Sequence, residues 1–132
     1  MKKIIYITFI LFTACKQPQA VFDIPPLVGK SIDEVREVLG KPQQEPMDRI
    51  DSLSTYFYNS YKKNSFLLNI RFNPKNRKIY HFHIISNDDD FDKLEDILKI
   101  GNLDSTSTAY SIETDQSFNY FNNYTNVTIY PK

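Results

Sequence analysis

Two histidines at alternate positions are the first candidates for chemistry. His81 and His83 lie in the run 78–86, whose apolar and polar residues alternate as in a β-strand. Side chains two positions apart on a strand point to the same face, so the two imidazoles can chelate a metal if a neighbouring strand supplies a third ligand. The sequence identifies no third ligand. We therefore expect no metal site, and predict both histidines on a half-exposed face that also holds Ile79 and Ile85, opposite the more aromatic face.

Two further patterns lack residues that the corresponding binding motifs need. Gly29-Lys30-Ser31 ends like a phosphate-binding loop, but Ile24 occupies the position of that loop's first glycine. Aspartates alternate over residues 88–92 as in a calcium loop, but lysines stand where that loop needs glycine and glutamate. Both patterns are better explained as helix caps.

The composition is that of one small domain. The 132 residues include 16 basic and 16 acidic side chains and 41% hydrophobic residues. This is too apolar for a disordered chain and too balanced in charge for an electrostatic grip on nucleic acid. No serine lies in a Gly-x-Ser-x-Gly elbow. We therefore expect no enzyme, no cofactor and no nucleic-acid partner.

The single cysteine, Cys15, follows an apolar run at the N-terminus. Two lysines precede residues 4–14, which have the character of a signal peptide and reach only about 16 Å as a helix, too short to cross a bilayer comfortably. Residues 11–15, Leu-Phe-Thr-Ala-Cys, resemble the lipobox of bacterial lipoproteins, except that Phe12 stands where that motif usually has leucine. The resemblance implies that residues 1–14 are a signal peptide and that Cys15 is lipidated at sulfur and anchors the mature chain in a membrane. The alternatives are an ordinary cleaved signal with a free thiol, or an uncleaved anchor.

The residues after Cys15 indicate which membrane the lipid anchor would enter. They read Lys-Gln-Pro-Gln, without aspartate. By resemblance to the enterobacterial sorting rule, this favours a cell-envelope location at the outer membrane, facing the periplasm.

Residues 29–132 are predicted to form a single α+β domain, with two short helices packed on an antiparallel sheet of about five strands. Residues 15–28 contain three prolines and no sustained apolar period, which predicts a tether. The first helix is predicted over Ile32–Leu39, because Ser31 and Glu34 form a capping box and Gly40 ends the pattern. Its expected apolar stripe is Ile32, Val35, Val38 and Leu39.

The rest of the domain is predicted from alternation and turn residues. The second helix is expected to begin at the aspartates of 88–90 and to end at Gly101, with Phe91 the first residue of its apolar stripe. Strands are predicted over residues 53–61, 65–73, 78–86, 108–113 and 124–130, with a turn over 73–77 and a loop over 116–123. In the third strand, Tyr80 is expected on the same face as Phe82 and Ile84.

The first helix also resembles part of a known family. Residues 27–42 fit the pattern Gly-x-[Ser/Thr]-x-x-Glu-Val…Leu-Gly-x-Pro, and are similar to small outer-membrane lipoproteins of the SmpA/OmlA type. The resemblance implies helices packed on a three-stranded antiparallel sheet, and some members are accessory subunits of the machine that inserts β-barrels. The same pattern occurs in β-lactamase-inhibitor-like folds. The expected second helix and extra strands depart from the family.

The expected function is that of a non-catalytic, lipid-anchored envelope protein that acts as a protein-interaction or assembly module with an envelope protein partner. The alternative is a lipoprotein that binds a small molecule or glycan through a surface rich in tyrosine and phenylalanine, of which the chain has nine and ten. The best local candidates for contact with a partner are Phe118, Tyr120 and Phe121, in an otherwise Asn-rich segment.

Overall fold

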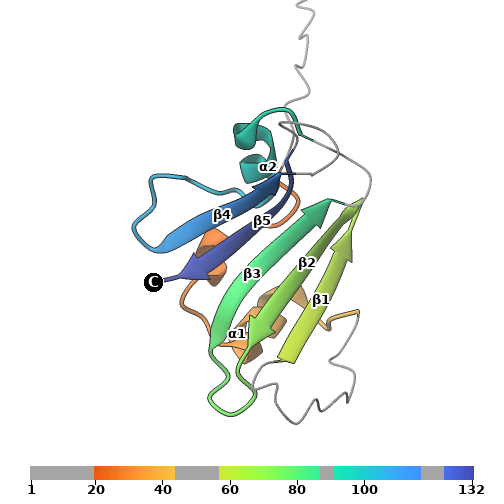
Figure 1. The fold of residues 1–132 in the computed structure, drawn as a ribbon. Coiled ribbons are helices and arrows are strands. Elements are labelled where there is room, and N and C mark those ends of the chain that lie inside the picture. The colour runs from red at the N-terminus through yellow and green to blue at the C-terminus, as the bar shows by residue number, and fades with distance from the viewer. Residues whose placement is uncertain (1–19, 44–56, 87–90, 117–123) are drawn as a thin grey trace, which may run out of the picture.

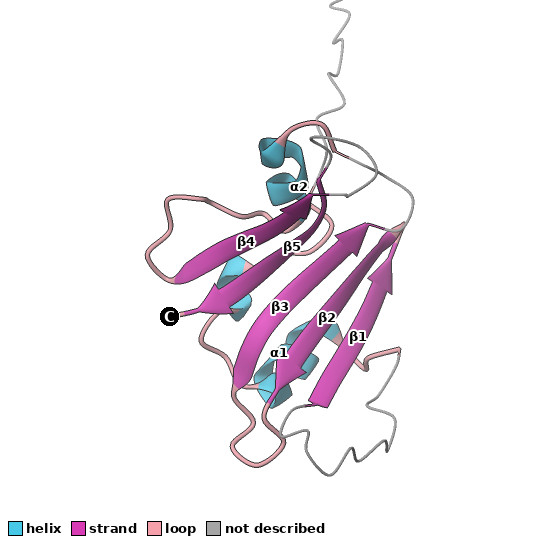
Figure 2. Ribbon diagram, viewed as in Figure 1, coloured by secondary structure: helices cyan, strands magenta, loops and turns pink. Residues whose placement is uncertain are grey.

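A five-stranded antiparallel sheet forms the centre of the fold, with both helices on one of its faces (Figures 1 and 2). The structure is a computed structural model that describes residues 20–43, 57–86, 91–116 and 124–132. The strand order across the sheet is β1-β2-β3-β5-β4. The elements in chain order are the 3-10 helix η1 (Pro25–Leu27), α1 (Ile32–Leu39), β1 (Phe57–Lys63), β2 (Phe66–Phe72), β3 (Ile79–Ser86), α2 (Leu94–Ile100), β4 (Tyr110–Gln116) and β5 (Tyr124–Pro131). The predicted α+β class is confirmed.

The hydrophobic core lies between the helices and the sheet. Alternate residues of β2 are buried from Phe66 to Phe72, as the period of a half-buried strand requires. The register aligns Ile70 with Phe82 and Phe82 with Ile129, so one apolar row crosses three strands. These three side chains have no exposed surface. The core therefore fixes which face of each strand points to the helices.

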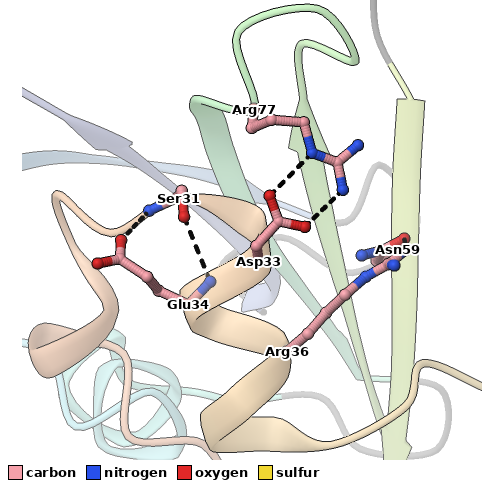
Figure 3. Close-up of polar contacts among 6 residues, drawn as sticks. All are labelled: Ser31, Asp33, Glu34, Arg36, Asn59 and Arg77. Atoms are coloured by element: carbon pink, nitrogen blue, oxygen red, sulfur yellow. Dashed lines mark hydrogen bonds and ion pairs between the residues drawn. The ribbon is translucent and has the colours of Figure 1, made fainter.

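The first helix forms where its local signals predict. Glu34 Oε2 accepts a hydrogen bond from the Ser31 N–H at 2.7 Å, and Ser31 Oγ accepts one from the Glu34 N–H at 3.2 Å (Figure 3). The helix ends at Gly40, whose φ of 84° disfavours other residues. The predicted place of Val38 in the apolar stripe is wrong, because Val38 is 61% exposed. At 3.6 residues per turn, Val38 lies about 120° around the helix from Ile32.

Polar contacts tie α1 to β1 and to the turn between β2 and β3. Asp33 accepts two hydrogen bonds from Arg77, at 2.7 and 3.0 Å, and the Arg36 guanidinium donates to Asn59 Oδ1 at 3.1 Å (Figure 3). Arg77 closes the predicted turn over 73–77 with a φ of 63°. The guanidinium of Arg77 lies over the Phe72 ring, 5.3 Å from its centroid. The turn between β2 and β3 is thus held against the start of α1.

Residues 20–28 belong to the folded domain, so the prediction of a tether over 15–28 is wrong for this part. Phe22, Ile24 and Leu27 are at most 5% exposed and lie in the hydrophobic core. The N–H groups of Val21 and Phe22 donate to the carbonyl of Ile100, at 2.9 Å each. Long-range packing thus orders a segment that has no periodicity of its own.

The second helix starts later than predicted. Phe91 is extended and exchanges two backbone hydrogen bonds with Tyr124, at 3.0 and 2.8 Å, while its ring stacks on Phe66. The helix begins at Leu94, and residues 88–90 lie outside the described part of the chain. The predicted end at Gly101 is confirmed. A Cβ on Gly101 would come within 2.9 Å of Ile84 Cδ1, so the glycine allows close packing on β3.

Neither helix among the described residues has the length and hydrophobicity needed to cross a membrane.

Candidate interaction surface

The sheet face opposite the helices is the candidate functional surface. No described helix or strand crosses this face, which points toward the viewer in Figure 1. We call it the front face. Its residues alternate along each strand with those of the core, so the register determines its membership.

A β-bulge at Tyr80 changes which residues lie on the front face. Arg71 pairs with His81, but Phe72 pairs with Ile79, so Tyr80 is an extra residue in β3. Ile79 packs against the core, and Tyr80 is 47% exposed on the other side. The predictions that Tyr80 shares a face with Phe82 and that Ile79 lies beside the histidines are therefore wrong. The prediction that the histidines lie opposite the more aromatic face of β3 is also wrong, since Tyr80 lies on their own face.

Six side chains from four neighbouring strands contact one another on the front face. We call them the front-face cluster: Tyr58, Arg71, Tyr80, His81, His83 and Tyr130. The Arg71 guanidinium lies 5.7 Å from the ring centroid of Tyr58 and 5.4 Å from that of Tyr80, within cation–π range. The His81 ring is at the centre of the cluster, 5.5 Å from the Tyr80 centroid and 5.6 Å from that of Tyr130.

His81 is held in its neutral form. The side chain is only 9% exposed, and burial lowers its pKa to about 4, with further lowering by the charges of Arg71 and His83. Its Nδ1 atom has no hydrogen-bond partner among the described residues. At neutral pH His81 therefore adds no charge to the cluster, and the guanidinium of Arg71 is its permanent positive charge.

The two histidines lie on one face, as predicted from their spacing, with their ring centroids 6.3 Å apart. Both contribute rings to the front-face cluster. Within the described segments, no group of three or more histidine, cysteine, aspartate or glutamate side chains is placed to hold a metal ion. The predicted half-exposed face is found, since Tyr58 and Tyr80 on it are 43% and 47% exposed, although His81 itself is buried within it.

The predicted contact residues lie elsewhere in the chain. Cys15, Phe118, Tyr120 and Phe121 are outside the described residues. Sequence reasoning missed Arg71 as a member of this surface. A signal was present, because Arg71 alternates with the apolar residues of its strand and must face away from them. No sequence signal marks the bulge that brings Tyr80 to the front face.

Comparison with known proteins finds no matching family model, no similar curated protein and no similar solved structure.

Proposed function

We propose that the chain is a non-catalytic, lipid-anchored protein of the bacterial cell envelope that binds a protein partner through its front face. The anchor is inferred from the lipobox-like residues that end at Cys15. The protein-binding role is inferred from the front-face cluster, which is the single observation that carries this part of the proposal. The Lys-Gln-Pro-Gln sequence after Cys15 supports a location at the outer membrane, facing the periplasm.

The residue types of the cluster favour a protein partner. Tyrosine and arginine are enriched in protein interfaces and among the residues that contribute most to their affinity. Tyr58 and Tyr80 are 43% and 47% exposed, so both rings are available for contact. The contacts among Arg71, His81 and the tyrosine rings also restrict these side chains before binding, which lowers the entropic cost of association.

The width of the front-face cluster also favours a protein partner. Its members come from β1, β2, β3 and β5, which are consecutive in the sheet. At about 4.8 Å between strands, the cluster spans roughly 14 Å. An area of this width can form the centre of a protein interface, whose contact residues commonly surround a few anchoring side chains.

A small molecule or glycan is the second candidate ligand for the same surface. The exposed rings of Tyr58 and Tyr80 favour it, since aromatic side chains also line small-molecule sites. The two candidates predict different outcomes when the intact protein is captured from crosslinked envelopes. A reproducible, stoichiometric protein partner supports the first, and its absence together with saturable binding of one small ligand supports the second.

The variant Tyr80→Ala tests the role of the front face. Tyr80 is half exposed, so its truncation should leave the fold intact while weakening partner capture about tenfold or more, the range expected for an interface hot spot. Lys75→Ala is the matched control, because Lys75 is exposed in the turn between β2 and β3. Circular dichroism verifies folding of both variants. Equal capture by the wild type and Tyr80→Ala would refute this surface as the binding site.

The variant Cys15→Ala tests the anchor separately. Lipidation at sulfur requires the thiol, so the variant should accumulate as an uncleaved or soluble precursor without acyl mass. Membrane fractionation and intact-mass spectrometry measure both properties. A wild-type protein that lacks acyl mass would contradict lipidation whatever the front face binds.

A further inference from the structure

A hollow of about 540 Å³ lies beside the first described residue, Ala20. Three segments line it: residues 20–23, residues 38–43 at the end of α1, and residues 61–63 at the end of β1. Its basic residues are Lys41, Lys62 and Lys63, all of them exposed.

The lining also contains an exposed apolar side chain and one acidic group. Val38, at the end of α1, is 61% exposed. The carboxylate of Asp23 accepts a hydrogen bond from Asn102 Nδ2 at 2.9 Å, so a neighbouring amide satisfies it. The hollow thus brings three ammonium groups and an exposed valine together at one end of the domain.

The chain that leads to this hollow is short. Ala20 is five positions after Cys15. Since an extended chain spans at most about 3.6 Å per residue, Ala20 lies within roughly 18 Å of the Cα atom of Cys15. Val21 and Phe22 are already fixed by hydrogen bonds to Ile100. An anchor at Cys15 would therefore hold this end of the domain close to the bilayer.

We propose that the hollow bordered by Lys41, Lys62 and Lys63 is the surface through which the domain contacts anionic phospholipid headgroups. This inference rests on the lipid anchor of the proposed function. Each lysine near an anionic membrane surface changes partitioning by about fivefold, and Lys16 adds a further positive charge beside the anchor in the sequence. The exposed Val38 then meets the boundary between headgroups and acyl chains, as apolar residues of membrane-surface helices do.

The intact lipidated protein, reconstituted in vesicles, allows the orientation of the domain to be measured. Lipidation occupies the thiol of Cys15, so Val38→Cys provides one reactive thiol for a fluorophore. The control position is Tyr80→Cys, on the front face and similarly accessible. Vesicles of phosphatidylcholine, with or without phosphatidylglycerol, carry a nitroxide on the headgroup that quenches a nearby fluorophore.

We expect severalfold stronger quenching at position 38 than at position 80, increasing further with phosphatidylglycerol. Replacing both Lys41 and Lys63 by glutamate should abolish that increase. The matched double replacement of Lys75 and Lys78 by glutamate changes the charge equally, because both lysines are exposed and lie between β2 and β3. Figure 1 shows this connection at the end of the sheet away from α2. This control should leave the quenching at position 38 unchanged.

The outcomes separate this inference from the proposed anchor. Equal quenching at positions 38 and 80, in protein that carries acyl mass on Cys15, overturns the membrane-facing hollow and leaves the anchor standing. Quenching that does not respond to phosphatidylglycerol overturns the anionic-headgroup assignment. If the Lys41/Lys63 and Lys75/Lys78 replacements change the quenching at position 38 equally, this hollow is not the surface that contacts the headgroups. If Cys15 carries no acyl mass, the proposed anchor is wrong, and the membrane-facing hollow that rests on it is wrong as well.

Discussion

Replacing Ile24 by alanine tests whether residues 20–28 are part of the folded domain. Ile24 has no exposed surface, and its N–H donates to the carbonyl of Gly101 at 3.2 Å. At about 0.8 kcal/mol per buried carbon, the three carbons that the substitution removes contribute about 2.4 kcal/mol. The cavity left behind raises the expected loss to about 3–4 kcal/mol. This is a large part of the roughly 5–15 kcal/mol that stabilises a typical domain.

The loss is measurable by urea and thermal unfolding, followed by far-ultraviolet circular dichroism. At about 4 °C per kcal/mol for a domain of this size, the melting temperature should fall by roughly 12–16 °C. Val38→Ala is the control, because Val38 is 61% exposed and its truncation should change stability by at most about 0.5 kcal/mol. If Ile24→Ala unfolds like Val38→Ala, residues 20–28 are not part of the cooperative core.

Two further predictions concern the cap of α1 and the protonation of His81. Ser31→Ala removes the cap acceptor of Glu34 N–H and should lower the free energy of unfolding by about 1 kcal/mol; an unchanged urea midpoint would contradict this. The pKa of His81 should be about 4 in an NMR titration of the folded protein, and a value near 6.5 would show that the ring is not buried as described. Because an unfolded histidine binds its proton below about pH 6.5, and the folded one binds it only near pH 4, stability should fall as the pH drops through this window. His81→Gln should remove that part of the pH dependence.

Features that depend only on residues close together in the sequence could be predicted from it. The bounds of α1 follow from Ser31, Glu34 and Gly40, because a helix cap joins groups only three or four residues apart. The faces of β2 follow from alternation alone. For the same reason Arg71 could be assigned to the face opposite the core, although its cluster of rings could not.

The candidate surface depends on contacts between residues distant in the sequence. The bulge at Tyr80 is set by the register between β2 and β3, and no local pattern records which residue of a strand is left unpaired. The burial of His81 depends on rings from β1 and β5. Its lowered pKa therefore arises only in the assembled sheet.

The sequence by itself determined the α+β class and the limits of α1, because helix caps and strand alternation each depend on a short run of residues. The anchor at Cys15 stays a prediction. Only the tertiary structure decided that Ile24 lies in the core, that Phe91 pairs with Tyr124 instead of entering α2, and that Tyr80 joins His81 on the front face. In each of these cases the burial or the hydrogen bonds come from segments far away in the chain. Such contacts outweigh the weak local preferences of the residues that make them.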